Sequence, residues 1–277
     1  MRPPIEEAFR RPAVVGIVNV TPDSFSGDGV LDPSAAAAQG RAMLDEGAAL
    51  VDVGGESTRP GSAPVPLGEE LRRVLPVLEG LSGLPVSIDT SKAEVARRAV
   101  ALGAVMVNDV TALRSDSELV EVVAESGAYL CLMHMLGEPR TMQENPRYDD
   151  VVADVAAFLE ERLAFAVGAG VPEERICLDP GIGFGKTVEH NLELIARLDE
   201  IRALGRPVLV GASRKRFTGR ILGDEDALTG PVSVALAMTI LAYERGASLF
   251  RVHDARPHVD ALRAVQAVEG VAERTTS

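Results

Sequence analysis

Residues 14–29 read VVGIVNVTPDSFSGDG, an apolar run rich in β-branched residues that turns polar at Asn19. A continuous apolar run, without alternation, predicts a strand buried on both faces, as in a parallel sheet covered by helices. A loop of Ser, Gly and Asp follows the polar turn. The fold therefore depends on whether the same unit, a buried strand ending in polar residues, recurs along the chain.

This unit of a buried strand with a polar end occurs eight times in the sequence. Each short apolar run leads through a polar or glycine-containing joint into a longer stretch with helical periodicity. The runs are AVVGIVN (13–19), ALVDV (49–53), PVSI (85–88), VMVN (105–108), AYLCLM (128–133), ICLD (176–179), PVLVG (207–211) and SLFRV (248–252).

The stretches between the runs predict helices. In 32–47, Asp32 stands at an N-cap position, Pro33 at the first helical position and Gly47 at the end. Residues 149–170 place apolar side chains at a spacing of three to four. Further helices are expected within 91–104, 116–128, 188–205, 231–247 and 254–270.

Eight strand–helix units predict an α/β fold, a (β/α)8 barrel, because eight parallel strands close into a cylinder in about 250 residues. An open doubly wound sheet is the alternative. No low-complexity linker divides the 277 residues, so we expect one domain over 1–277, with 1–12 as a short N-terminal extension.

The net charge and the hydrophobicity of the chain exclude some classes of binding partner. A formal net charge of -13 argues against nucleic acid and anionic membranes, which require a basic surface. No apolar stretch approaches the roughly 20 residues of a membrane span, and the first residues do not resemble a signal peptide, so we expect a cytoplasmic protein. Cys131 and Cys177 each lie in an apolar run and are expected to be reduced core thiols.

Polar residues follow nearly every predicted strand. In a barrel of this type, the carboxyl ends of the strands carry the active site. The candidates that this placement brings to one rim are Asn19, Thr58, Arg59, Asp89, Asn108, Asp179, Ser213, Arg214, Lys215, Arg251 and His253.

Each candidate also has an ordinary structural explanation. Asp89 and Asp254 could cap the helices that follow them, and capping is the expected role of Asp254. Asn108 and Asp109 could form an Asx-turn. Residues 214–216 could be a solvated basic turn. The shared position on one rim favours function for the set.

Glycine patterns near Asp179 do not indicate a nucleotide site. GFGKT lacks the glycine that a P-loop needs five residues before its Gly-Lys pair, since position 180 is Pro. GIGFGK has Lys186 where a dinucleotide motif has its third glycine. The glycines are expected to form a close turn beside Asp179.

The rim combines two kinds of binding group. Carboxylates and an amide in an apolar barrel suit a flat heterocycle that offers an amino group and a ring N–H, and Lys215 can donate to the same ring. Arg251 and His253, with Thr58, Arg59 and Asn19, suit an anion such as a diphosphate. The residues alone imply a ligand with a heterocyclic end and a diphosphate end.

Eight segments resemble, in order and over nearly the whole chain, the motifs of the dihydropteroate synthase family. They are NVTPDSFSGDG (19–29), GGESTRPGS (54–62), SIDTSK (87–92), VNDVT (107–111), LMHMLGEPRTMQENPRYDDV (132–151), LDPGIGFGKT (178–187), GASRKRF (211–217) and RVHD (251–254). The resemblance implies a homodimeric (β/α)8 barrel that joins 6-hydroxymethyl-7,8-dihydropterin diphosphate to 4-aminobenzoate, releases diphosphate and uses Mg²⁺.

The resemblance also implies roles for individual residues. The pterin pocket would consist of Asp89, Asn108, Val110, Met133, Asp179, Phe184, Lys215 and Arg251. The diphosphate would meet Asn19, Thr58, Arg59, Arg251 and His253, with Asn19 also meeting Mg²⁺. The 4-aminobenzoate and sulfonamide surface would comprise Phe25, Thr58, Pro60, Ser213 and Lys215. Catalysis would depend on Asn19, Asp89, Lys215, Arg251 and His253.

One loop departs from the family pattern. The family more often reads Ser-Phe-Ser-Asp-Gly-Gly, whereas here Gly27 precedes Asp28, so Asp28 is given no role and Asp23 is the better carboxylate candidate. Three other functions stay open at this point. They are a corrinoid-linked methyltransferase, a Schiff-base aldolase with Lys215 as nucleophile, and a noncatalytic pterin-binding paralogue.

Overall fold

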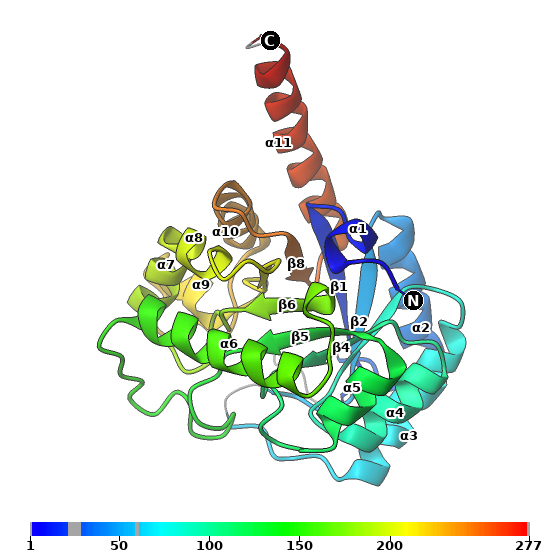
Figure 1. Cartoon of the computed structure of the whole chain (residues 1–277). Coiled ribbons are helices and arrows are strands. Elements are labelled where there is room, and N and C mark those ends of the chain that lie inside the picture. The colour runs from blue at the N-terminus through cyan, green and yellow to red at the C-terminus, as the bar shows by residue number, and fades with distance from the viewer. Residues whose placement is uncertain (1, 22–28, 59–60, 276–277) are drawn as a thin grey trace.

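The computed structural model describes residues 2–21, 29–58 and 61–275. Within these ranges, eight parallel strands form a nearly closed barrel surrounded by helices (Figure 1). The strands are β1 (Ala13–Asn19), β2 (Leu50–Gly54), β3 (Val86–Asp89), β4 (Met106–Asp109), β5 (Tyr129–Met133), β6 (Ile176–Asp179), β7 (Leu209–Val210) and β8 (Leu249–Val252). The predicted fold class is confirmed.

Hydrogen bonds join the strands in the order β6-β5-β4-β3-β2-β1-β8-β7. The two ends of this row meet through a single parallel bridge between Leu178 and Val208, which brings β6 beside β7. The barrel, rather than the open sheet considered as the alternative, is the observed arrangement. All strand carboxyl ends therefore lie on one rim.

The helices are α1 (Ile5–Ala8), α2 (Pro33–Asp45), α3 (Leu67–Gly80), α4 (Ala93–Ala101), α5 (Leu119–Ser126), α6 (Val151–Gly168), α7 (Val188–Ala196), α8 (Leu198–Arg202), α9 (Arg216–Arg220), α10 (Val232–Glu244) and α11 (Ala255–Thr275), with a 3₁₀ turn at Glu173–Arg175. The start of α2 is as predicted, since the Asp32 carboxylate accepts from the Ser34 N–H at 2.9 Å. Gly47, with φ of +104°, follows that helix.

The helices differ from the sequence prediction in two ways. The single helix expected within 188–205 is two helices, α7 and α8, which meet at Arg197. The structure also adds α1, α3 and α9 to the predicted set. The buried face of α3 includes Glu70, which accepts from Thr90 Oγ1 at 2.7 Å and also pairs with Lys92.

The barrel interior is layered. Because side chains on one face of a strand recur every two residues, Leu50, Met106, Cys177 and Leu249 lie one layer below Asp52, Asn108, Asp179 and Arg251. The lower layer is apolar and α1 closes it from the amino end, where Ile5 is fully buried and Phe9 packs edge-on against Tyr129. Cys131 and Cys177 are free, buried and paired in register across β5 and β6. The polar layer above rests on this apolar floor.

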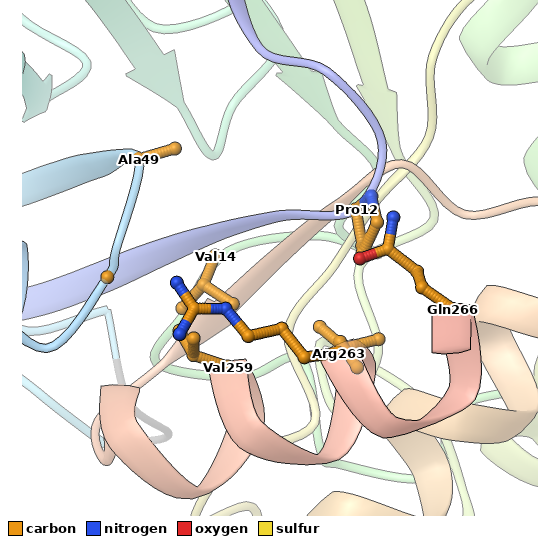
Figure 2. Close-up of a pocket in the computed structure, with 8 residues that line it drawn as sticks. Pro12, Val14, Ala49, Val259, Arg263 and Gln266 are labelled. Carbon is orange, nitrogen blue, oxygen red and sulfur yellow. The ribbon is translucent and has the colours of Figure 1, made fainter. Parts of the chain in front are cut away.

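A small pocket opens at the opposite, amino end of the barrel (Figure 2). Val14 at the start of β1, Ala49 just before β2, and Val259 and Arg263 of α11 line it. In this fold, residues of the amino end contribute stability rather than catalysis.

Helix α11 extends well beyond the barrel, with the C-terminus at its far end (Figure 1). Val268 and Val271 on this part are 70% and 52% exposed. Within the described ranges, no helix is both long and apolar enough to cross a bilayer.

Candidate active site

Four of the predicted residues come from four different strands and lie at one place inside the barrel. Asp89 ends β3, Asn108 lies in β4, Asp179 ends β6 and Arg251 lies in β8. Asp89, Asn108 and Asp179 are 8%, 5% and 6% exposed, too little for polar side chains that serve only to face solvent. The structure thus brings these predicted residues together.

Arg251 is the centre of this group. Its Nε donates to Asp52 Oδ2 at 2.6 Å and its Nη2 donates to Asp89 Oδ2 at 2.7 Å. Asp89 therefore pairs with a cation across the barrel. The alternative role as a helix cap does not apply, because Lys92 is the N-cap residue of α4 and the first N–H of that helix, from Ala93, donates to Asp116 Oδ2 at 2.8 Å.

Asp52 is a site residue that the sequence analysis did not name. Besides Arg251, its Oδ2 accepts from Asn108 Nδ2 at 2.9 Å. Its Oδ1 is buried and has no hydrogen-bond partner within the described part of the chain. A signal was present in the sequence, since Asp52 is the only charged residue inside the apolar run ALVDV (49–53). A charge in such a run is costly unless it is paired or functional.

The neighbour of Asn108 has a different role. Asp109 Oδ1 accepts from the N–H and hydroxyl of Thr111, and Oδ2 accepts from the Leu113 N–H at 2.6 Å. The proposed Asx-turn is therefore correct for Asp109, whereas Asn108 faces Asp52. Adjacent strand residues point to opposite faces, which explains the division.

An apolar wall borders the polar group. Val110, Met133, Met135, Met142 and Phe184 form one buried cluster, of which Met135 and Met142 are additional to the prediction. Lys215 places its Nζ 3.9 Å from the centre of the Phe184 ring, a cation–π contact. The arrangement gives a flat ring an apolar face and polar groups at its edge.

Asp179 lies in a tight turn. Its Oδ1 accepts from the Gly181 N–H at 2.7 Å, and Gly181 has φ of +68°. A side chain at position 181 would meet the carbonyl oxygen of His134 at 1.8 Å, so the chain passes too closely for any residue but glycine. The expectation that glycine permits a close turn beside Asp179 is correct.

Burial sets the protonation of the carboxylates. Desolvation raises the pKa of Asp89 to about 7, against the opposing effect of Arg251. Desolvation likewise raises the pKa of Asp179 to about 6, while the Gly181 N–H and Lys215 favour its charged form. For Arg251, burial disfavours the charge, but Asp52 and Asp89 outweigh it and raise the pKa. Perturbed acids in a cleft are typical of functional sites.

The remaining described candidates lie around the same rim. His253 Nδ1 lies 3.1 Å from Ser213 Oγ, which also accepts from the His253 N–H. Asn19 ends β1, and its carbonyl accepts from the Val30 N–H at 3.0 Å. Thr58 is half-buried in the segment after β2. Phe25, Arg59 and Pro60, as well as Asp23 and Asp28, lie outside the described residues.

One cation of the basic turn at 214–216 forms an ion pair with a carboxylate. Arg214 Nη2 donates to Asp254 Oδ1 at 2.8 Å, and Arg214 has φ of +53°. The Asp254 carboxylate accepts in this ion pair, and its expected role as the cap of α11 stays a prediction. Lys215 follows as the N-cap residue of α9. The pair holds the turn that presents Lys215.

No group of three or more His, Cys, Asp or Glu side chains with metal-ligand geometry occurs among residues 2–21, 29–58 and 61–275. Mg²⁺, which the resemblance predicts, takes oxygen ligands, and the side chain of Asn19 at the end of β1 carries an amide oxygen of that kind.

A family model described as pterin binding enzyme matches residues 15–253, which include every strand from the third residue of β1 onward. The chain belongs to the pterin-binding enzyme family.

Two similar relatives of known function are both dihydropteroate synthases. The chain is 45% identical to the dihydropteroate synthase of Escherichia coli K12 and 47% identical to that of Mycobacterium leprae, in each case over 262 residues and 92% of this chain, and over 91% and 92% of the relatives. The chain is also similar to solved structures of this enzyme. One, from Xanthomonas albilineans with 4-aminobenzoic acid, is 48% identical, has a TM-score of 0.84 and covers 94% of both chains. Another, from Burkholderia cenocepacia complexed with 7,8-dihydropteroate, is 44% identical, has a TM-score of 0.85 and covers 96% of this chain and 94% of that one.

Proposed function

We propose that this chain condenses 6-hydroxymethyl-7,8-dihydropterin diphosphate with 4-aminobenzoate to give 7,8-dihydropteroate and diphosphate, the dihydropteroate synthase reaction. The observation that carries the proposal is the buried group of Asp52, Asp89, Asn108 and Arg251, which lies beside Asp179 at the carboxyl rim of a barrel of this family. The enzyme is a transferase of the pterinylmethyl group.

The pterin fits the polar layer. Its amino group and ring N–H need acceptors, and the Asp179 carboxylate, the Asn108 amide oxygen and the unpartnered Asp52 Oδ1 offer them. Lys215 donates to the ring, and Phe184 and Met133 form the apolar wall. Specificity follows because a ring without these donors would leave buried acceptors unpaired.

The reaction begins at the pterin methylene carbon. Its bond to the diphosphate oxygen breaks and the oxygen keeps the electron pair, which leaves a cation delocalised into the pterin. The 4-aminobenzoate nitrogen then attacks that carbon and afterwards loses a proton. Asp89 and Asp179 stabilise the positive charge, whereas Arg251 and His253 stabilise the charge growing on the diphosphate. Loss of one such donor typically costs ~3 to 4 kcal/mol of barrier.

Mg²⁺ belongs to the proposal, and Asn19 would hold it together with diphosphate oxygens and water. When bound, it neutralises part of the negative charge of the leaving diphosphate. Thr58 and Arg59 would contact the same anion from the segment after β2.

The second substrate requires positioning more than activation. We assign it to Phe25, Thr58, Pro60, Ser213 and Lys215. Among these, Ser213 is fixed by its bonds with His253, and Lys215 by its contact with Phe184. Holding the amine near the methylene carbon lowers the barrier by removing translational and rotational freedom.

A cytoplasmic homodimer is part of the proposal. Support for the dimer comes from α11, whose outer part extends away from the barrel with Val268 and Val271 exposed. A second copy that packs on this helix would bury both side chains.

The test is to incubate the purified protein with the dihydropterin diphosphate, 4-aminobenzoate and Mg²⁺, and to look for dihydropteroate by mass spectrometry. Lys215→Ala should lose most of the product. Absence of product from the wild-type protein would overturn the proposed function, and full retention by Lys215→Ala would remove Lys215 from the site. Borohydride trapping with a carbonyl substrate would expose a Schiff-base aldolase instead.

A further inference from the structure

Two buried titratable residues beside the pterin site have no part in the reaction described above. Lys186 and His134 are 3% and 5% exposed. Lys186 Nζ lies 2.9 Å from His134 Nδ1 and donates to the carbonyl oxygen of Phe184 at 3.0 Å. A buried ammonium is expensive and persists only where something requires it.

The choice of lysine at this position is informative. The chain has 28 Lys and Arg residues, and only Lys92, Lys186 and Lys215 are lysine. All three follow the carboxyl ends of strands, namely β3, β6 and β7. Elsewhere the chain uses arginine, whose planar guanidinium is larger and cannot lose its charge. In this chain, the small ammonium group of lysine occurs only at this rim of the barrel.

Lys186 joins two segments that carry the site. His134 follows β5 and lies edge-on to Phe158 of α6, with ring centres 4.9 Å apart. Asp179 ends β6, and Phe184 belongs to the segment that follows it. Through His134 and the Phe184 carbonyl, Lys186 ties the end of β5 to the loop that presents Phe184 to the pterin.

We propose that Lys186 is a positioning residue, which fixes Phe184 and stabilises the negative charge of Asp179 from behind the pterin pocket, with neutral His134 as its fixed acceptor. The inference rests on the proposed function, because it assigns Lys186 to the pterin half of that site. Lys186 does not contact the reacting atoms.

The charges around the pair agree with this role. Groups that act on Asp179 are the Gly181 N–H, Lys215, Arg251 and Lys186. Desolvation, together with the charge of Lys215, lowers the pKa of Lys186 to about 7, while Asp179 supports the charged form. Burial, Lys186 and Arg114 lower the pKa of His134, so His134 is neutral and can accept. Lys186 is thus charged below about pH 7, the range in which Asp179 starts to take up a proton.

The test compares binding of the dihydropterin diphosphate by calorimetry, from pH 5.5 to 8.5, in the wild type, Lys186→Gln and Arg72→Gln. In Lys186→Gln, the pH at which the affinity falls on acidification should be about one unit higher than in the wild type. Affinity should be about fivefold weaker at pH 6 and within about twofold of wild type at pH 8.5. Arg72 is 71% exposed, and its replacement removes one positive charge without moving the profile.

A purely structural role would weaken binding equally at every pH, and an unmoved profile in Lys186→Gln would overturn the inference. A second readout does not depend on that variant folding well. With ¹³Cε-lysine labelling, three signals are expected, and the Lys186 signal should titrate at lower pH in Asp179→Asn than in the wild type. An unchanged Lys186 titration would also overturn the inference. Failure of the wild type to bind the pterin would overturn the proposed function as well.

Discussion

Asp52 is the residue on which the charge balance of the site depends. Two cationic or donor groups, Arg251 and Asn108, converge on its Oδ2, and it is 1% exposed. Removing one partner of a buried ion pair leaves the other uncompensated, which costs more than the pair contributes. Asp52 therefore supports both the geometry and the stability of the barrel interior.

We expect Asp52→Ala to lower the free energy of unfolding by about 3 kcal/mol, because, among the residues that the structure describes, Arg251 then keeps only its ion pair with Asp89. Urea denaturation measures the change. Asp45→Ala, which removes an exposed carboxylate from α2, serves as the control and should stay within about 0.5 kcal/mol of the wild type. Equal stability of the two variants would show that Asp52 does not hold Arg251.

The pH dependence of pterin binding follows from Asp179. Only the ionised carboxylate accepts from both donors of the ring, and burial raises its pKa to about 6. Affinity should therefore be complete above that pH and decline as the pH falls through about 6. Calorimetry across this range checks the sign. Affinity that rises on acidification would mean that Asp179 binds in its protonated form.

At the level of residues, the sequence predicted which polar residues lie at the rim of the barrel. It did not predict which of them form ion pairs with one another. Asp89, Asn108, Asp179 and Arg251 were identifiable because each stands at or near the end of a strand. Asp52 was missed, although it stands fourth of five in ALVDV just as Arg251 does in SLFRV, and its charge inside that apolar run was the available signal. The Arg251 bonds to Asp52 and Asp89 span 199 and 162 residues of sequence, and no local pattern encodes them.

The segment between β6 and α7 is the element that shapes the pocket. It follows Asp179, the last residue of β6, and carries Phe184, which forms part of the pocket wall, and Lys186, which lies behind both. Gly181 allows it to pass the carbonyl of His134, and Tyr148 and Gln143 bond to the carbonyls of Gly185 and Gly183 at 2.8 Å. Contacts with His134, Gln143 and Tyr148 thus fix this segment.

Gly181→Ala should disrupt this segment. A Cβ there would lie 1.8 Å from a backbone atom that has no room to move, in addition to the strain of positive φ. We expect loss of pterin binding and lower stability than in Gly205→Ala. Gly205 has φ of +81° with nothing within 4 Å of its Cβ position, so it reports the backbone strain alone. Thermal melts of both variants, with pterin titration, make the comparison. If the two behaved alike, close approach at Gly181 would not matter.

For the elements, the strands and most helices could be predicted because buried parallel strands read as continuous apolar runs and the helices carry caps. The break at Arg197 could not. There, Arg197 pairs locally with Glu193 and Glu200 and also with the distant Asp150, the N-cap residue of α6, a contact that helical periodicity does not encode. β7 is only Leu209–Val210, shorter than its apolar run, because its neighbour β6 meets it through one bridge.

The molecule as a whole unites these parts through the closure of the barrel. Residues from β2, β3, β4, β6 and β8 face one another only because the parallel sheet curves until β6 meets β7. Eight repeated units indicated that closure, and the net charge of -13 argued against nucleic acid and anionic membranes as partners. The resemblance in sequence supplied the identity of the ligand, which geometry alone would leave as a flat ring bearing an anion.

The most direct test of this account is calorimetric titration of the dihydropterin diphosphate into the wild type, Asp179→Asn and Asp45→Asn at pH 8. Loss of the charged acceptor at position 179 should weaken binding by about a hundredfold, since hydrogen bonds to a charged group contribute about 1.5–3 kcal/mol. Asp45→Asn should bind as the wild type does. Wild-type affinity in Asp179→Asn would contradict the account, because the pterin would then bind somewhere other than the buried polar layer of the barrel.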